Sequence, residues 1–126
     1  MSSNFVVGNM ADDVVKITLE LCGKDENKTL CFPKVFYDNY VQRIIMIALN
    51  IQQLVYEANG IQRGEYRSEK QRQAASICEY LNHLIRIAGD FGWISEKQRD
   101  RWQKSVTYLK WRIVQWYKSD RDFLEK

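Results

Sequence analysis

Six residues in the C-terminal part of the chain combine positive charge with aromatic rings at a helical spacing. They are Arg101, Lys104, Tyr108, Trp111, Gln115 and Lys118, separated by 3, 4, 3, 4 and 3 positions. Residues at such intervals lie on one face of a helix. Arginine and lysine neutralise phosphates, and an exposed tyrosine or tryptophan stacks on an unpaired base for ~1–3 kcal/mol. The stripe therefore predicts a nucleic-acid-binding face.

Positive charge is concentrated around this stripe. Between Lys97 and Lys118 there are seven basic residues and one acidic residue, Asp100, which is a balance of +6. The whole chain carries +3, so the remainder sums to −3. Further phosphate or partner contacts are expected from Arg99, Lys110 and Arg112. Arg63 and Arg67 can extend the patch with less weight, because glutamates alternate with them.

A second interpretation of the same residues stays open. The basic residues can form a solvated face while Tyr108 and Trp111 pack against a neighbouring helix or subunit. Spacing alone favours neither interpretation. In the second case the basic face docks an acidic protein and the aromatic rings anchor the interface. A protein-interaction module is therefore the alternative function.

No constellation typical of an enzyme accompanies the stripe. His83 is the one histidine, and we interpret it as a surface or partly buried helix residue. A zinc site would need His83 together with Cys22, Cys31 and Cys78, but none of the paired zinc-ligand spacings is present. There is no glycine-rich phosphate loop and no cluster of acidic residues for magnesium. We predict a non-catalytic protein that needs neither metal nor cofactor.

Four helices are expected to position these residues. The 126 residues include one proline and six glycines, and long apolar runs repeat at helical spacing. The expected helices span about 12–22, 35–59, 66–89 and 95–119. Asp12 or Asp13 can cap the first helix, and Ser95 with Gln98 forms a capping box for the fourth. Short connections then favour an all-α, antiparallel up-and-down four-helix bundle over 12–119. Residues 1–11 and 120–126 are expected to be flexible or frayed tails.

Apolar seams mark the sides of these helices that face the core. In the last helix the seam is Trp102, Val106, Leu109, Ile113 and Trp116. In the third it is Ala74, Ile77, Leu81, Leu84, Ala88 and Phe91. In the second it is Tyr37, Val41, Ile44, Ala48, Ile51, Val55 and Ala58. The second helix also has apolar residues off its seam, namely Ile45, Ile47, Leu49 and Leu54. A helix that is apolar on several sides is central or meets another subunit, and for so small a chain we predict a subunit interface.

The chain is expected to be cytoplasmic and not to associate with membranes. Its longest apolar run, Ile44 to Leu49, has six residues, far fewer than the roughly 18 of a membrane span. The N-terminus lacks the basic start and apolar stretch of a secretory signal. Three scattered cysteines do not suggest a disulfide framework.

Several short motifs occur in an order that resembles a known family. They are Phe32-Pro33, Arg43 early in the second helix, Ile85-Arg86-Ile87-Ala88 with Asp90, the I-S-x-K-Q start of the fourth helix, and Trp116 near its end. In these features residues 12–119 resemble the four-helix-bundle family of accessory variability determinant proteins, which are encoded with the reverse transcriptases of diversity-generating retroelements. The same family includes proteins encoded in intervening sequences of large-subunit ribosomal RNA genes. Val114 and Gln115 stand where the family often has small residues.

The resemblance implies a specific function. Accessory variability proteins form a pentameric barrel of four-helix protomers with a positively charged surface. They bind the reverse transcriptase and its template RNA, with DNA as a further ligand, and they support the error-prone cDNA synthesis of mutagenic retrohoming without being catalytic. By this resemblance the expected partners are a reverse transcriptase, template RNA and further copies of the chain. The intervening-sequence branch remains the alternative, as a protein-protein interaction module.

Overall fold

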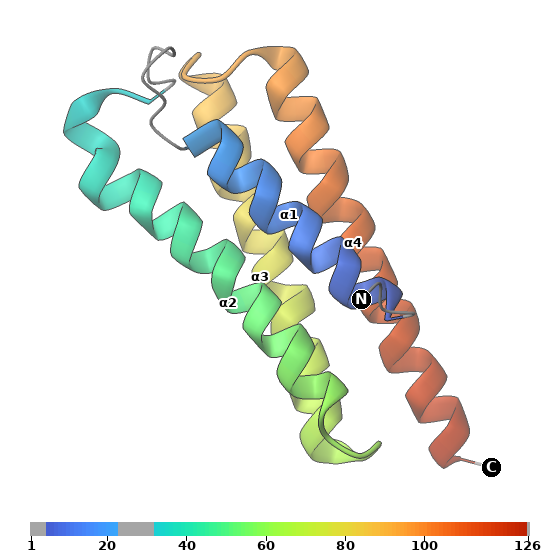
Figure 1. Cartoon of the computed structure of the whole chain (residues 1–126). Helices are drawn as coiled ribbons and strands as arrows, with labels where there is room; N and C mark the ends of the chain where they lie inside the picture. The colour runs from blue at the N-terminus through green and yellow to red at the C-terminus, as the bar shows by residue number, and fades with distance from the viewer. Residues whose placement is uncertain (1–4, 23–31, 126) are drawn as a thin grey trace.

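The computed structural model describes residues 5–22 and 32–125. Within these residues the chain forms four α-helices and no strand (Figure 1). They are α1 (Val6–Cys22), α2 (Gln42–Asn59), α3 (Glu65–Asp90) and α4 (Glu96–Leu124). A 3₁₀ turn, η1 (Lys34–Phe36), and a π-helical turn, η2 (Tyr37–Val41), lead directly into α2. The prediction of an all-helical fold with four helices is confirmed.

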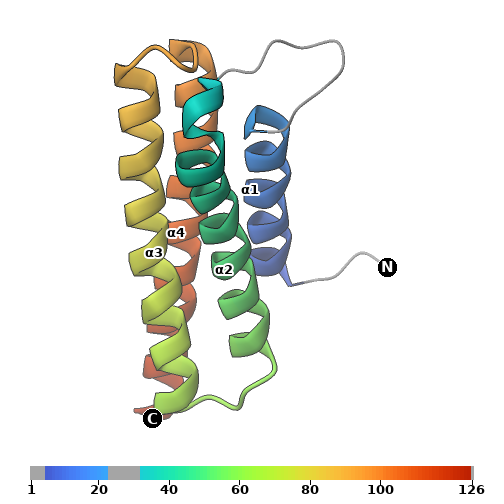
Figure 2. The same ribbon diagram turned by 90° about the vertical axis from the view of Figure 1, so that its left-hand side faces the viewer.

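The helices pack in a closed ring. α1 contacts α2 and α4, and α3 contacts the same two helices from the other side. Figures 1 and 2 show the four helices side by side. α1 has 17 residues, whereas α3 has 26 and α4 has 29. In both views α1 consequently lies along the upper part only, and the lower ends of the other three helices extend beyond it.

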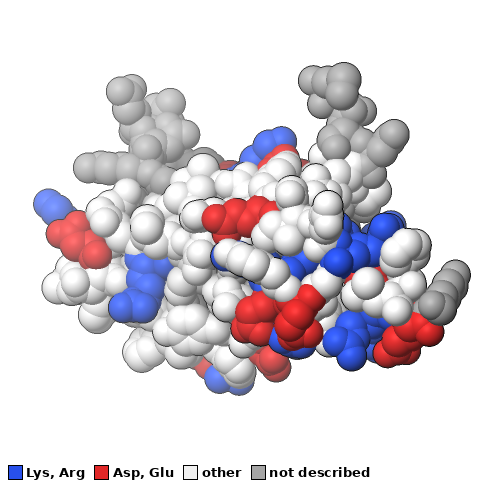
Figure 3. Space-filling view, turned by 90° about the horizontal axis from the view of Figure 1, so that it is seen from below, with Lys and Arg blue, Asp and Glu red and all other residues white. Residues whose placement is uncertain are grey.

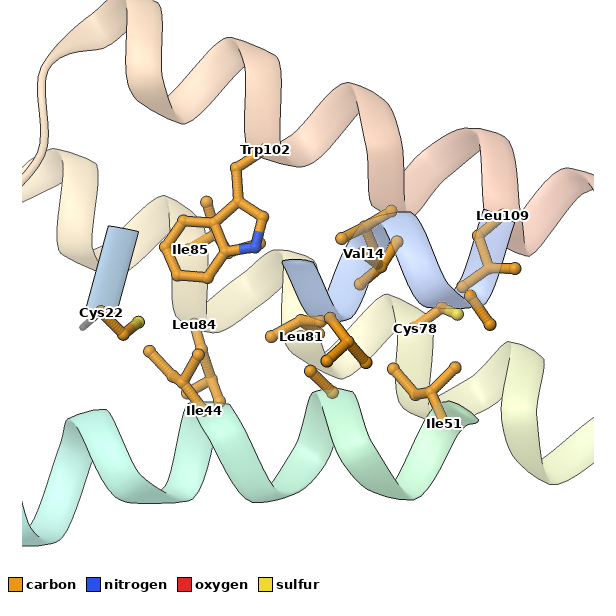
Figure 4. Packing of buried hydrophobic residues seen from close by; sticks show 14 of the residues in the cluster. Val14, Cys22, Ile44, Ile51, Cys78, Leu81, Leu84, Ile85, Trp102 and Leu109 are labelled. Carbon is orange, nitrogen blue, oxygen red and sulfur yellow. The ribbon is translucent and has the colours of Figure 1, made fainter. Parts of the chain in front are cut away.

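The core forms where the predicted seams meet. Trp102, Val106, Leu109 and Ile113 of α4 have no accessible surface, and the seam of α2 from Val41 onward is buried with them. Figure 4 shows the indole of Trp102 pointing from α4 into the middle of the bundle. Burying a large apolar side chain contributes roughly 1.5–3 kcal/mol. In α3 the prediction was wrong at Phe91, which is exposed, and the buried set includes Cys78 and Ile85 instead.

The first helix begins well before the predicted residue 12. It starts at Val6, so the prediction of a flexible tail is wrong for residues 6–11, while residues 1–4 lie outside the described part of the chain. The reason is tertiary: the ring of Phe5 packs edge-on against Tyr56 and Trp116, with ring centres 5.8 and 5.3 Å away. Gly8 lets this ring approach, because a Cβ there would collide with it.

Asp12 does not cap α1, since it lies in the second turn of the helix. Its carboxylate instead accepts hydrogen bonds from α2, from Gln52 Nε2 at 2.8 Å and from Tyr56 Oη at 3.0 Å. The capping prediction was wrong because it placed the start of the helix at residue 12, whereas α1 starts at Val6. Asp12, which was predicted to cap α1, is therefore part of the contact between α1 and α2.

The start of α4 is as predicted. The backbone N–H of Gln98 donates to Ser95 Oγ at 3.0 Å, and the backbone N–H of Ser95 donates to Gln98 Oε1 at 2.8 Å. Gly92 in the preceding corner has φ of 73°, a left-handed conformation that glycine adopts at little cost. This local structure fixes where α4 begins.

The end of α4 differs from the prediction. The helix continues through the expected frayed tail to Leu124, so that prediction is wrong. Asp120 is the reason, because its side chain is buried and bonded to α3 and to the connection before it. Residue 126 lies outside the described part of the chain.

Candidate nucleic-acid interface

Tyr108 and Trp111 lie on the side of α4 next to the core seam. Tyr108 is 52% exposed and Trp111 is 57% exposed. Neither ring is buried in the core of its own chain, and packing against a neighbouring helix or subunit stays a prediction. Two large aromatic surfaces on one helix face are available for stacking on a ligand.

A groove follows the seam between α1 and α4. It consists of three hollows of about 460, 490 and 330 Å³ from top to bottom, of which the first two share Tyr108 and the last two share Arg112. We call this the α1–α4 groove. The upper hollow is lined by Asp13, Lys16, Ile17, Glu20, Arg101, Lys104, Ser105 and Tyr108. The middle hollow is lined by Met10, Thr107, Tyr108, Trp111 and Arg112. The lower hollow is lined by Phe5, Val6, Val7, Asn59, Arg112, Gln115, Trp116 and Ser119.

Several of the predicted phosphate-binding residues already have carboxylate partners. Arg101 pairs with Glu20 of α1 at 3.1 Å, Lys110 pairs with Glu79 of α3 at 3.1 Å, and Arg99 pairs with its neighbour Asp100 at 3.2 Å. Such exposed pairs contribute about 0–1 kcal/mol each, so a ligand can displace them. They nevertheless reduce the positive field of α4 below its formal charge.

Other basic residues of α4 have no ion pair with any residue in 5–22 or 32–125. They are Lys97, Lys104, Arg112 and Lys118. Lys104 places its ammonium 5.6 Å from the centre of the Tyr108 ring, which is cation–π distance. Arg112 is partly buried where the middle and lower hollows join. Lys104 and Arg112 are thus the unpaired cations that α4 contributes to the groove, and α1 contributes Lys16.

Arg67 does not extend this basic surface, and that prediction is wrong. Its Nε lies 2.7 Å from Asp120 Oδ2, and only 13% of its side chain is exposed. Its guanidinium also lies 4.8 Å from the centre of the Trp116 ring. The pairing was missed because Asp120 was placed in a tail. Arg67 stabilises the bundle instead of offering its charge to a ligand.

Arg63 shares this carboxylate but stays half exposed. Its Nε lies 3.2 Å from Asp120 Oδ1, and its guanidinium lies 4.2 Å from the centre of the Phe123 ring. Gln71 Nε2 donates to the other oxygen at 2.9 Å. Figure 3 looks at the molecule from below and shows basic and acidic side chains interleaved, not a continuous basic face.

Only some of the residues predicted to form a subunit interface on α2 are accessible, and the interface itself stays a prediction. The prediction is wrong for Leu54, because this side chain is 6% exposed and belongs to the core of its own chain. Ile45 and Ile47 are half-buried and pack against that core. Leu49 is accessible, and Met46, which was not among the predicted residues, is 64% exposed. Both line a hollow on the outer face of α2 that also contains Arg43.

An aromatic cluster at the corner between α3 and α4 was not predicted as a unit. The ring of Phe91 stacks on Trp93 with centres 4.9 Å apart, and Phe36 of η1 lies 5.2 Å from the same indole. Tyr40 also packs against Trp93 and donates a hydrogen bond to the carbonyl of Leu84 at 2.7 Å. The cluster fixes η1 against the top of the bundle.

The residues considered for catalysis or metal binding are not brought together. His83 is exposed, and burial raises the pKa of the Cys78 thiol to about 12, which keeps it protonated at neutral pH. Cys22 is buried, and Cys31 lies outside the described residues. Among the described residues, no three histidine, cysteine or carboxylate side chains gather as a metal site.

Comparison of the chain with family models, curated proteins and solved structures found no match. The similarity to accessory variability proteins therefore stays a hypothesis that depends on the short motifs alone. In the part of the chain that the structure describes, no helix has the length and apolar character needed to span a bilayer.

Proposed function

We propose that the protein is a non-catalytic nucleic-acid-binding module and that α4 supplies its contact surface. One observation carries the proposal: Tyr108 and Trp111 are more than half exposed beside Lys104 and Arg112, which have no carboxylate partner among the described residues. Cations that track the phosphate backbone next to aromatic rings that accept bases are typical of nucleic-acid-binding surfaces. Lys118 extends the same face toward the lower end of α4.

On the strength of the sequence resemblance, the proposal extends to a biological role. The protein would serve a reverse transcriptase of a diversity-generating retroelement as an accessory subunit, bind template RNA and DNA, and support error-prone cDNA synthesis in the cytoplasm. The same proposal includes an antiparallel up-and-down bundle assembled as a cyclic homo-oligomer, a pentamer by the resemblance. The exposed apolar residues Met46 and Leu49 on the outer face of α2 support such an assembly, because an oligomer would cover them.

Salt dependence of binding tests the central claim. We would measure the anisotropy of a labelled RNA on titration with the full chain over a range of salt concentrations. Affinity should fall linearly on a logarithmic scale, since each phosphate contact releases a counterion. The double variant Lys104→Glu, Arg112→Glu should lose binding. Lys110→Glu is a control for each single charge reversal, because Lys110 lies outside the groove and pairs with Glu79 of α3. Binding that ignores salt, or no binding to any RNA or DNA, would refute the proposal.

The apolar middle of the groove favours a second candidate, a protein-interaction module. Met10, Tyr108 and Trp111 line one continuous hollow, and tyrosine and tryptophan are enriched at interface hot spots. An amphipathic helix with acidic residues would fit the same charges. The two candidates differ in their ligand, so competition between an oligonucleotide and an acidic helical peptide separates them.

A further inference from the structure

Arg112 is a partly buried cation in the α1–α4 groove whose side chain has no partner among the described residues. It lies at the junction of the middle and lower hollows, and none of its side-chain donors meets a carboxylate or carbonyl of the described residues. A guanidinium offers five N–H donors in a planar fork that matches a phosphate. Removing such a group from water without a partner costs free energy. The position therefore favours an anionic ligand seated on Arg112.

Charge differs along the groove. The upper hollow contains Asp13 and Glu20 together with its cations, so it is electrically mixed. Among the described residues that line the middle and lower hollows there is no carboxylate, and Arg112 is the one charged residue. An anion consequently meets less repulsion in these two hollows than in the upper one. A phosphate is expected there, with the rest of its ligand in the same two hollows.

The remaining lining suits a nucleobase. Trp111 in the middle hollow offers exposed aromatic surface beside Arg112, whereas Trp116 in the lower hollow is partly buried against Phe5 and the guanidinium of Arg67. The lower hollow is also lined by Asn59 and Gln115, residues whose side-chain amides can donate to and accept from the edge of a base. An acidic helix would use the arginine and the apolar surface but would leave these amides without a matched role.

We infer that the middle and lower hollows of the α1–α4 groove bind single-stranded nucleic acid, with a phosphate on Arg112 and an unpaired base on Trp111. A duplex can use the cations, but its bases are stacked within the helix and cannot reach the indole. The two hollows extend along α4 from Thr107 to Ser119, which is about 18 Å at 1.5 Å per residue, enough for a few nucleotides. This inference depends on the proposed nucleic-acid function and specifies the form of the ligand.

The test compares a labelled oligouridylate with a hairpin duplex of the same number of phosphates, both titrated with the full chain. The single strand should bind about tenfold or more tightly than the duplex. Trp111→Ala should weaken the single strand about tenfold and leave the duplex unchanged, while Trp111→Phe should retain most of the affinity. Arg112→Gln should reduce the salt slope by about one. Tyr80→Ala is the matched control, since Tyr80 is an exposed ring on α3 away from the groove.

The outcomes separate the two claims. Equal affinity for strand and duplex, or equal losses for both in Trp111→Ala, would overturn the single-strand site and leave nucleic-acid binding standing. Absence of salt-dependent binding to every probe would overturn both. Binding of an acidic helical peptide that Trp111→Ala weakens, without any binding of oligonucleotides, would overturn the inference in favour of a protein ligand. Circular dichroism of each variant confirms that it folds.

Discussion

The indole N–H of Trp102 donates a hydrogen bond to the hydroxyl oxygen of Thr18 at 3.1 Å, and both residues are buried. The Thr18 hydroxyl in turn donates to the carbonyl of Val14, one turn back in α1, at 2.7 Å. This relay gives the largest side chain of the core a partner for its one polar atom. It also ties the helix that carries the candidate interface to α1, which forms the other wall of the groove.

Thr18→Val tests this relay. The substitution keeps the side-chain shape but removes the acceptor, so that the buried N–H of Trp102 loses its partner. We expect the free energy of unfolding to fall by about 1–3 kcal/mol, measured by urea denaturation. Thr18→Ser retains the hydroxyl and serves as the control. A Thr18→Val protein with the denaturation midpoint of the parent would show that the bond contributes nothing.

Asp120→Ala tests the ion-paired cluster at the lower end of the bundle. The change leaves the guanidinium of Arg67 largely buried without its carboxylate. Breaking a buried pair in this way costs about 3–5 kcal/mol, and we expect the lower value because Arg63 is half exposed. Asp122→Ala is the control, because Asp122 is exposed and should change stability by less than about 0.5 kcal/mol. Equal effects of the two variants in thermal or urea unfolding would contradict the assignment.

Stability should fall at alkaline pH through Cys78. Burial raises the pKa of its thiol from 9.0 to about 12. The unfolded chain releases this proton above pH 9, whereas the native chain holds it until about pH 12, so the unfolded state gains in between. Below pH 9 the thiol is protonated in both states, so the full free energy of unfolding is retained. Between pH 9 and about pH 12 the free energy of unfolding falls by up to about 1.4 kcal/mol per pH unit.

Cys78→Ala provides the control for this pH dependence. Burial also raises the pKa of Tyr40, which acts in the same direction and remains in the variant. Urea unfolding at several alkaline pH values should therefore give a flatter profile for Cys78→Ala than for the parent, although the variant is less stable at neutral pH. Parallel profiles would show that the thiol titrates alike in both states.

Met46→Glu tests the proposed oligomer. Met46 is 64% exposed and lies beside Leu49, so a charge there should not disturb the core of the chain. If copies of the chain meet through the outer face of α2, the variant should run as a smaller species in light scattering after size-exclusion chromatography. Leu19→Glu on α1 is the control, because Leu19 is also an exposed apolar residue but lies on another helix. A parent protein that is itself monomeric would refute the interface.

Features that depend on neighbouring residues were predicted correctly from the sequence, whereas features that depend on contacts between distant residues were not. Ser95 and Gln98 are three residues apart, so the start of α4 follows from neighbouring residues. The start of α1 depends instead on Phe5 meeting Trp116, far along the chain. Asp120 likewise depends on arginines 53 and 57 residues away, which no periodicity reveals. Leu54 was misassigned because an off-seam position on a helical wheel can still face a third helix.

The candidate site shows the same division. The spacing of Tyr108 and Trp111 correctly placed them on one face beside the core seam, and their exposure agrees with that placement. The groove itself could not be predicted, because its other wall comes from α1 residues such as Met10. Pairing with Glu20 also depends on how α1 packs. Charge counts along one helix therefore overstated the free positive charge.

The short length of α1 has a consequence for how the molecule comes apart. Among the described residues four polar side chains are buried, and three of them, Ser68, Gln71 and Asp120, lie at the end of the bundle that α1 does not reach. Apolar burial is sparse there, so local opening costs less free energy than around Trp102. Amide hydrogens in the first turns of α3 and the last turns of α4 should exchange with solvent first. The bundle would then fray from its three-helix end while its four-helix end stays closed.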